Sequence, residues 1–594
     1  MKRFAIGSLV VLLVAGLAAP AAQARRGSAR SYVVGYEHGV SLAKAKRVVT
    51  ALGGRAVSAR PALHLMLVRS SRGGFAQAAA RSLTLRGAVR NQIIGRTATA
   101  TDKPDPIENE GRGGGSGGVT VREPVPGSLV EPLDGLQWDM RMISATASGS
   151  YATELGSKDV IVAVIDTGID GSHPDIAPNF NKSLSRNWTT DIPLIDGTCV
   201  SDPDHSCDDP NDVDEDGHGT HVAGTIASPI NGLGMAGVAP NVTLVNDRAG
   251  QDSGFFFLWQ TIQALTYAGD IGADVANMSF FTDPWQYNCP GGHPATNPLS
   301  GVPSDTSAQQ AEQGLILDAI QDAVDYAIDH NVTLVAAAGN DHQNLDGVKT
   351  DELSPDFPPG SETVRVVDDW CRDMPTEANG VISVSAVGPS GAKADYSNYG
   401  AGEETGGAGD DPAGEIDVAA PGGYFRDGFG TPHFRLPDNE ILGPYPLTVA
   451  RAAHEVDGAG KPKSEFVVRD CTAEKTITKA GPSPQPSAQT DCSYYQLIQG
   501  TSMASPHAAG VAALIVSRFG TADAQHGGLT MDPAAVRERL RATATNHACP
   551  VPATVDYTIV GRPASWNATC LGTPEYNGFY GDGIVDAAAA VSAP

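Results

Sequence analysis

Val160-Ile161-Val162-Ala163-Val164-Ile165 is an unbroken apolar run that leads directly into Asp166-Thr167-Gly168. A short apolar run of this kind, bounded by turn residues, predicts a strand that is buried on both faces. Comparable runs occupy residues 242–246, 275–279, 332–337 and 381–387, with helix patterns between them at 258–269, 316–330 and 502–518. Buried strands that alternate with helices predict a parallel α/β sheet. In such sheets catalytic residues gather at the carboxyl ends of the strands, which is where Asp166 lies.

The charge of the chain is divided unevenly along its length. The 594 residues include 41 Lys and Arg against 68 Asp and Glu, which gives a net charge of −27. Residues 25–100 hold 14 basic residues and one acid, Glu37, whereas residues 101–594 hold 25 basic and 67 acidic residues. The acidic body excludes nucleic acid as the main partner, because phosphate binding needs a basic face. The basic leader is either an interaction tail or a segment attracted to the acidic body.

The first residues predict export. Met1-Lys2-Arg3 is a positive start, residues 4–20 are apolar and almost uncharged, and Ala22-Gln23-Ala24 is a small-residue cleavage signature. This order is typical of a secretory signal peptide, which we assign to residues 1–24. The alternative is a membrane anchor, but the apolar core is shorter than the ~20 residues that a spanning helix needs. We therefore expect a secreted, extracellular protein with no membrane partner.

All eight cysteines lie beyond residue 198. They are Cys199, Cys207, Cys289, Cys371, Cys471, Cys492, Cys549 and Cys570. An even number of cysteines in an exported chain predicts disulfide bonds. Pairing each cysteine with its neighbour in sequence is the simplest arrangement, although spacing alone leaves the other connectivities open.

Composition divides the chain into segments. Residues 25–96 contain strand patterns at 32–36 and 64–68 and helix patterns at 41–52 and 75–83, which together predict a small α+β unit. Residues 97–132 are rich in Gly, Pro, Thr and charge, and are expected to form a linker. The main domain follows at 133–594. A Pro-rich, polar insertion interrupts its α/β pattern at about 426–493.

Three motifs contain the residue types needed for nucleophilic catalysis. They are DTGIDGSHPD at 166–175, DGHGTHVAGT at 216–225 and GTSMASPHAAG at 500–510. A serine hydroxyl becomes a nucleophile when an imidazole takes its proton, and a carboxylate orients that imidazole and stabilises its cation. In sequence and in their order along the chain, these motifs closely resemble those of the subtilisin-like serine proteases. The resemblance covers about residues 133–594, apart from the insertions.

The resemblance implies a doubly wound, mostly parallel sheet and a role for each motif. Asp166 orients the imidazole, His218 is general base and then general acid, and Ser502 is the nucleophile. Asn340 corresponds to the side-chain donor of the oxyanion hole, beside the Ser502 N–H at a helix start. His221 is expected to be a packed histidine. A zinc site formed by the two histidines is a poor alternative, because their spacing differs from that in H-E-x-x-H.

Substrate contacts are also implied by the resemblance. Ser279-Phe280-Phe281 corresponds to the strand that pairs with the substrate backbone. Phe281 stands where the family usually has glycine, and its ring either narrows a pocket or turns away. Ala338 and Gly339 are expected on the opposite side, which favours an apolar primary pocket.

Calcium is the one metal that the resemblance suggests, with Asp134, Asp175 and Asn231 as its expected ligands. Their oxygens are the hard donors that calcium prefers. A second acidic run, Asp208 to Asp216, precedes His218. We expect it to be a solvated loop rather than a site.

These features predict a secreted serine endopeptidase that is made as a self-processing zymogen. It would hydrolyse polypeptides through an acyl-enzyme, use no cofactor for catalysis, and act as a monomer. Residues 25–96 resemble the family's ferredoxin-like propeptide, an intramolecular inhibitor, and the maturation site is expected within 97–132. The alternatives are a precursor-processing protease of narrow specificity and a catalytically silent binding protein with this fold. For the leader, the alternative is a basic binding module.

Overall fold

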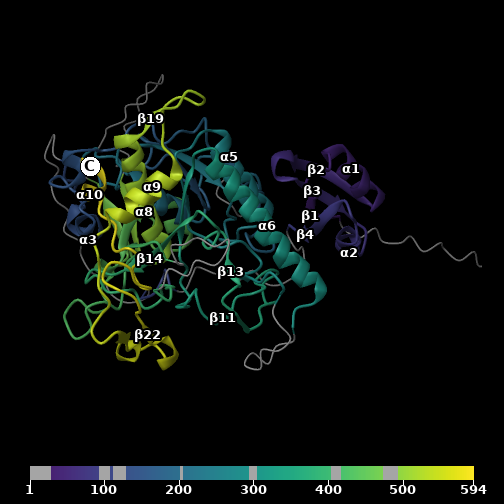
Figure 1. The fold of residues 1–594 in the computed structure, drawn as a ribbon. Coiled ribbons are helices and arrows are strands. Elements are labelled where there is room, and N and C mark those ends of the chain that lie inside the picture. Colours follow the sequence, from purple (N-terminus) through teal and green to yellow (C-terminus); the bar gives the residue numbers. More distant parts are fainter. Residues whose placement is uncertain are drawn as a thin grey trace, which may run out of the picture.

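The computed structural model describes residues 29–91, 107–111, 129–200, 205–292, 304–402, 416–471 and 492–593. These residues form a large α/β body and a smaller α+β unit that lies against two of its helices (Figure 1). The predicted signal peptide at 1–24 and most of the predicted linker at 97–132 lie outside the described residues.

Seven parallel strands form the central sheet in the order β15-β14-β10-β8-β5-β7-β6. They are β5 (Ile161–Ile165), β6 (Arg186–Asn187), β7 (Thr243–Arg248), β8 (Val275–Met278), β10 (Thr333–Ala337), β14 (Ile382–Val387) and β15 (Val418–Pro421). The sequence predicts all but the edge strands β6 and β15. Because β5 lies between β7 and β8, the chain winds outward on both sides of it. The carboxyl end of β5, where Asp166 follows, is therefore a topological switch point.

Helices cover both faces of this sheet, because side chains alternate between the faces along each strand. Val162 and Val164 of β5 pack in one core with α4 (His218–Ala227) and α8 (Thr501–Phe519). Ala163 and Ile165 pack in a second core with α5 (Leu258–Asp270) and α6 (Ser307–Asp329). The expected doubly wound α/β fold is confirmed. Three further helices of the body, outside the insertion, are α3 (Trp138–Met142), α9 (Pro533–Ala542) and α10 (Ala587–Val591).

Helix α6 begins earlier than the residue 316 predicted from apolar periodicity. Thr306 and Gln309 form a capping box in which each side chain binds the backbone of the other residue. Such a box satisfies N–H groups that a helix start leaves free. The first turns of α6 are polar, so periodicity alone does not reveal them.

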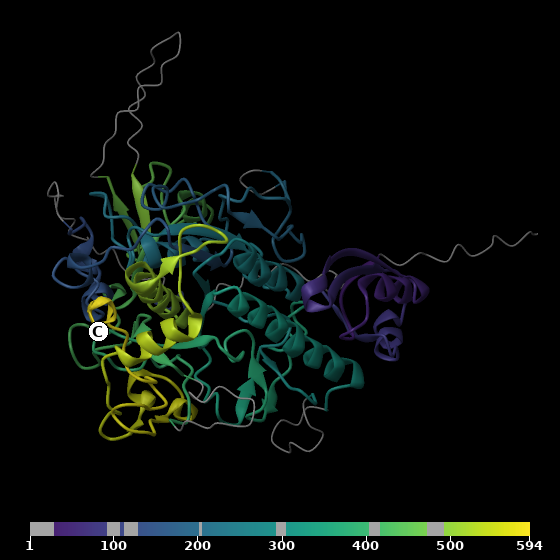
Figure 2. The same cartoon turned by 45° about the horizontal axis from the view of Figure 1, so that its top comes forward.

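The smaller unit contains β1 (Arg30–Tyr36), α1 (Leu42–Ala51), β2 (Gly54–Arg60), β3 (Leu65–Ser70), α2 (Phe75–Ala80) and β4 (Leu85–Arg90). Its antiparallel sheet has the order β2-β3-β1-β4. Tyr32, Val34 and Phe75 belong to a core of its own. Val33 and Val89, on the other face, pack in the core that includes α5 and α6. Figures 1 and 2 both show this unit beside the two helices.

The insertion at 426–493 contributes two strands and a helix to an ordered layer, and a third strand begins at its end. β16 (Ile441–Pro444), β17 (Val467–Asp470) and β18 (Ser493–Ile498) form an antiparallel sheet, and α7 (Leu447–Ala452) follows β16. Leu442, Tyr495 and Leu497 share a buried cluster with Met235 of the body. β16 packs against α4, so this layer supports the helix that carries the 216–225 motif. The Pro-rich composition of the insertion obscures its strands.

Short antiparallel pairs lie outside these layers. They join β9 (Tyr287–Asn288) with β13 (Arg372–Asp373), β11 (Lys349–Asp351) with β12 (Arg365–Val367), β19 (Thr521–Ala522) with β20 (Leu529–Thr530), and β21 (Thr554–Val555) with β22 (Ala568–Thr569).

Four disulfides connect cysteines that are neighbours in sequence, so the simplest pairing is confirmed. They are Cys199–Cys207, Cys289–Cys371, Cys471–Cys492 and Cys549–Cys570. Among the described residues, no helix combines the length and the apolar character that crossing a bilayer requires.

Candidate active site

Asp166 and His218 meet at the carboxyl edge of the sheet. Asp166 follows β5 and is fully buried, and His218 is the first residue of α4. The His218 Nδ1 lies 2.8 Å from the Asp166 Oδ1. The Thr167 N–H donates to the same carboxylate oxygen at 2.7 Å. A buried carboxylate on Nδ1 leaves Nε2 as the ring nitrogen that can exchange a proton with a substrate-side group.

Asp214 fixes the start of α4. The N-cap of this helix is Gly217, which has a left-handed backbone (φ 102°) and no side chain to cap the first turn. The Asp214 Oδ1 accepts the Gly217 N–H at 2.9 Å, and its Oδ2 accepts the Thr220 N–H at 3.0 Å and hydroxyl at 2.5 Å. Asp214 is 2% exposed. The expectation that the 208–216 acids form a solvated loop is therefore wrong for this residue.

Ser502 lies in the first turn of α8, two residues after Gly500. Its hydroxyl is 3.5 Å from the Ser279 carbonyl oxygen, so β8 and α8 meet at this serine. The Thr501 N–H and hydroxyl both donate to the Asn340 Oδ1 at 2.9 Å, which fixes that amide. The Asn340 Nδ2 lies 3.5 Å from where a Cβ on Gly500 would stand. The structure thus brings Asn340 to the start of α8, beside Ser502.

Glu108 occupies the centre of this site. Its carboxylate contacts both Ser502 and His218, and its Oε1 lies 3.5 Å from the His218 Nε2. The Glu108 side chain is 13% exposed. Burial lowers the pKa of His218, but the Asp166 and Glu108 carboxylates outweigh it and raise that pKa well above its usual value. Burial likewise opposes ionisation of Glu108, but His218 holds the pKa of Glu108 below its usual value.

Glu108 carries no signal in the sequence, because a lone glutamate in a Gly-rich linker belongs to no motif or period. The Gln499 Nε2 donates to the Ile107 carbonyl at 2.9 Å, which holds the chain next to Glu108. Glu110, two residues further on, pairs with Arg426 and Arg562. Residues 107–111 of the predicted linker therefore lie against His218 and Ser502.

His221 is a packed histidine. It is fully buried, and its Nε2 lies 3.0 Å from the Ile441 carbonyl oxygen and 3.2 Å from that of Gln496. Burial lowers its pKa to about 3, so the ring is neutral at ordinary pH. These contacts join α4 to the β16–β18 layer, and the partners are backbone carbonyls rather than a metal.

The residues expected to contact substrate have different surroundings in the structure. The Ser279 hydroxyl is buried against α8, 2.9 Å from the Ser505 hydroxyl, so only its backbone can pair with a substrate. The Phe280 ring stacks on Phe256, with centroids 4.0 Å apart, and Phe281 is half-buried. Ala338 is fully buried in a small apolar cluster. Gly339 has φ 97°, a backbone that favours glycine, and precedes Asn340.

The expected calcium ligands do not fit a calcium ion. Asp175 and Asn231 do come together, but the Asp175 carboxylate already accepts three donors. These are the Asn231 Nδ2 at 3.2 Å, the Met235 N–H at 3.0 Å and the Tyr495 hydroxyl at 3.1 Å. Donor hydrogens that point at the carboxylate occupy directions that a cation would need. Asp134 begins a separate 3₁₀ turn, where its carbonyl accepts Arg141 at 2.7 Å.

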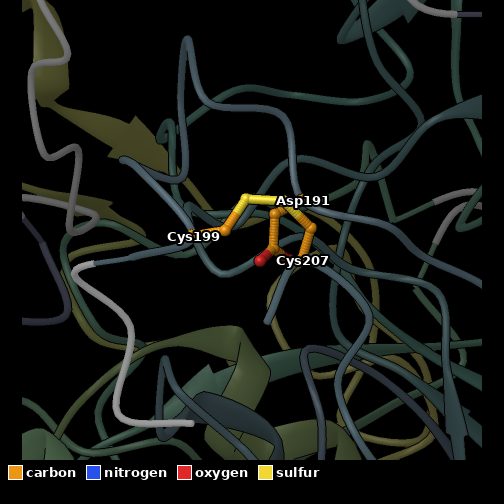
Figure 3. Close-up of side chains that lie close together, drawn as sticks. All are labelled: Asp191, Cys199 and Cys207. Atoms are coloured by element: carbon orange, nitrogen blue, oxygen red, sulfur yellow. A yellow bond between two sulfur atoms is a disulfide. The ribbon is translucent and has the colours of Figure 1, made fainter. Parts of the chain in front are cut away.

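A second acidic group lies beside β7. The buried Arg248 guanidinium binds Asp209 at 2.6 Å and Asp252 at 2.5 Å. The positive charge of Arg248 therefore pairs with the negative charge of these two carboxylates. Asp209, like Asp214, is buried rather than solvated. Asp191 lies next to the Cys199–Cys207 disulfide (Figure 3). Because the two sulfur atoms are bonded to each other, they offer no thiolate to a metal.

An α/β sheet that places a carboxylate, an imidazole and a helix-start serine at one edge defines a serine hydrolase. The chain matches the model of the Subtilase family over residues 157–561. Subtilisin DY of Bacillus licheniformis is 26% identical over 389 residues, which are 65% of this chain and 84% of that protein. The chain belongs to the subtilase family and is a serine-type endopeptidase.

Two further relatives carry names that describe a processing role. The epidermin leader peptide-processing serine protease EpiP of Staphylococcus epidermidis is 29% identical over 264 residues, 44% of this chain and 50% of that protein. The crystal structure of EpiP from Staphylococcus aureus has a TM-score of 0.56 at 20% identity and covers 95% of this chain and 98% of that one. The structural similarity supports the fold alone.

Proposed function

We propose that Asp166, His218 and Ser502 act as the catalytic triad of a secreted serine endopeptidase that is made as a zymogen. The observation that carries the proposal is the 2.8 Å contact between His218 and the buried Asp166, at the switch point of the sheet beside Ser502. The signal-like first residues and the four disulfides support secretion. Its partners are polypeptide substrates and its own leader, and it acts as a monomer.

The proposed reaction follows from the residues at the site. The Ser502 Oγ attacks the peptide carbonyl carbon while His218 takes the hydroxyl proton. The Asn340 Nδ2 and the Ser502 N–H stabilise the resulting oxyanion. The C–N bond then breaks, and His218 gives its proton to the leaving amine. Water attacks the acyl-enzyme with His218 again as base, which releases the acid and restores Ser502. No cofactor takes part.

Residues 107–111 support the zymogen proposal. Before substrate can reach Ser502, the Glu108 carboxylate must leave its contacts with Ser502 and His218. The unit at 30–90 holds the chain upstream of this segment against α5 and α6. We propose that this leader folds against the enzyme, blocks the site, and is removed by cleavage within 97–132.

The test compares the wild type with Ser502→Ala, and with Ser172→Ala as a control at an exposed serine. On an unstructured protein substrate, Ser502→Ala should lose about 10⁶-fold in kcat, and a serine-directed acylating inhibitor should label only the wild type and the control. N-terminal sequencing should find Ser502→Ala still joined to its leader. If Ser502→Ala cleaves as fast as the wild type, the triad is wrong. If the wild type cleaves no peptide, a silent binding protein is the better description.

A precursor-processing protease of narrow specificity is the second candidate. The ordered β16–β18 layer favours it, since this layer packs on α4 and continues into Gln499 and Gly500 beside the nucleophile. The names of the EpiP relatives are in keeping with such a role. Mass spectrometry of a digested, unfolded proteome distinguishes the two. Cleavage at a few closely related sequences supports processing, and cleavage at many unrelated bonds supports broad proteolysis.

A further inference from the structure

Glu110 is bound by two arginines. The Arg426 Nε donates to the Glu110 Oε1 at 2.6 Å, and the Arg562 Nη2 donates to the Oε2 at 2.7 Å. The Gln499 Nε2 is 3.4 Å from the same Oε2. Each carboxylate oxygen therefore has its own guanidinium. Such charge-assisted bonds are short and are about twice as strong as neutral ones.

The two arginines are part of a built pocket. Their side chains are only 13% and 12% exposed. Arg562 is oriented by Asp395, whose Oδ2 accepts its Nε at 2.6 Å, and by the Trp566 ring 4.5 Å away. The Arg426 Nη1 donates to the Val560 carbonyl at 2.5 Å. Fixed guanidinium groups bind a carboxylate without first having to be ordered.

The pocket holds more basic than acidic groups around Glu110. Arg426 and Arg562 share one buried carboxylate of the body, Asp395. Arg435 lies beside them, because its guanidinium approaches the same Val560 carbonyl as Arg426. Once the linker has left, the two guanidinium groups that bound Glu110 are free to bind another carboxylate by the same charge-assisted bonds.

The pocket lies next to the catalytic residues. Glu110 is two residues after Glu108, whose carboxylate contacts His218 and Ser502. The chain runs from the catalytic residues toward the arginines. In a substrate chain that runs in the same direction, the residue that takes the place of Glu110 lies on the C-terminal side of the scissile bond.

We propose that Arg426 and Arg562 form a subsite for an acidic side chain of the polypeptide substrate, about two residues C-terminal to the scissile bond. The inference rests on the proposed peptidase function and adds a substrate class to it: polypeptides with Glu or Asp just after the cleaved bond. In the zymogen, Glu110 fills this subsite.

The test uses the mature wild-type enzyme and internally quenched peptides that it cleaves at one bond. The parent peptide has Gln at the four positions before that bond and at the four positions after it. In each test peptide, Glu replaces one of these Gln residues. At low salt, Glu near the second position after the bond should raise kcat/KM about tenfold over Gln, the effect of a charge-assisted bond of ~1.5 kcal/mol. Glu on the N-terminal side should bring no such gain.

The main variant is Arg426→Gln, which retains the Arg562–Asp395 pair. It should bring the ratio of kcat/KM for the Glu peptide to that for the Gln peptide down to about one. Arg435→Gln is the matched control, because Arg435 also approaches the Val560 carbonyl, at 3.5 Å. It should keep the preference.

Three results would overturn the inference: equal rates for Glu and Gln peptides in the wild type, a preference that survives in Arg426→Gln, or a preference confined to the N-terminal side. Failure to cleave any peptide would instead contradict the proposed function.

Discussion

At the scale of single residues, Glu108 and His218 form a pair whose strength depends on pH. The pKa of docked His218 is raised and that of docked Glu108 is lowered. Both groups are therefore fully charged, and the ion pair is at full strength, at pH values that lie between the pKa values of undocked Glu108 and undocked His218. It is lost as pH rises through the raised pKa of His218, and also as pH falls through the lowered pKa of Glu108. We predict that alkaline pH loosens residues 107–111 around Glu108, while Glu110 still anchors the segment through Arg426 and Arg562.

Hydrogen exchange of these residues measures this loosening in the uncleaved Ser502→Ala chain. Glu108→Gln should increase exchange at neutral pH and flatten its pH dependence. It should also lower the pKa of His218, read from the imidazole NMR signals, because the variant removes one of the two carboxylates near that ring. Unchanged exchange across the alkaline range would contradict the prediction.

Some residues of the site can be predicted from the sequence, and others cannot. Asp166 and His218 come together as predicted, because each belongs to a long motif at an element boundary. Glu108 and Arg426 belong to no motif. Their meaning depends on a contact between residues that are hundreds of positions apart, and neither composition nor periodicity encodes such a contact.

At the scale of elements, α4 depends on Asp214 for its first turn, because its N-cap is a glycine. Asp214→Ala would leave the Gly217 and Thr220 N–H groups buried without that acceptor. We predict a loss of about 2–3 kcal/mol in the free energy of unfolding, and a lower kcat because His218 is the first residue of α4. Urea unfolding in a Ser502→Ala background gives the first quantity without self-digestion.

The control for this prediction is Asp212→Ala. Asp212 pairs with Lys182 at 2.5 Å, and these side chains are 26% and 62% exposed. A surface pair of this kind contributes less than about 1 kcal/mol. Equal losses in the two variants would show that Asp214 has no special role.

The elements also divide into those that sequence predicts well and those that it does not. The strands β5, β7, β8, β10 and β14 are buried on both faces and each contains a short apolar run, which the sequence reveals. β16 lies within a Pro-rich segment and β18 begins at its end, and both gain their burial from Met235 and α4. A strand stabilised by distant neighbours carries little local signal.

At the scale of the whole molecule, a basic leader lies on an acidic body. Arg60 pairs with Asp270 of α5 at 3.1 Å, and Arg86 pairs with Asp322 of α6 at 2.8 Å. The side chains of these pairs are 14–38% exposed, so salt screens them in part. Val33 and Val89 add apolar contacts that salt does not weaken. The leader should therefore be held by both kinds of interaction.

We predict that the leader, supplied in trans to the mature enzyme, inhibits it more weakly as salt rises. Two partly exposed pairs of ~0.2–1 kcal/mol each, together with screened long-range attraction, predict a rise in Ki of roughly threefold to tenfold between low salt and 1 M NaCl. A leader with Arg60→Gln and Arg86→Gln should inhibit less at low salt and show a smaller salt effect, whereas Arg47→Gln, on the exposed side of α1, should behave as the wild type. A Ki that does not change with salt would mean that the apolar contacts alone hold the leader, and that its basic charge has no part in inhibition.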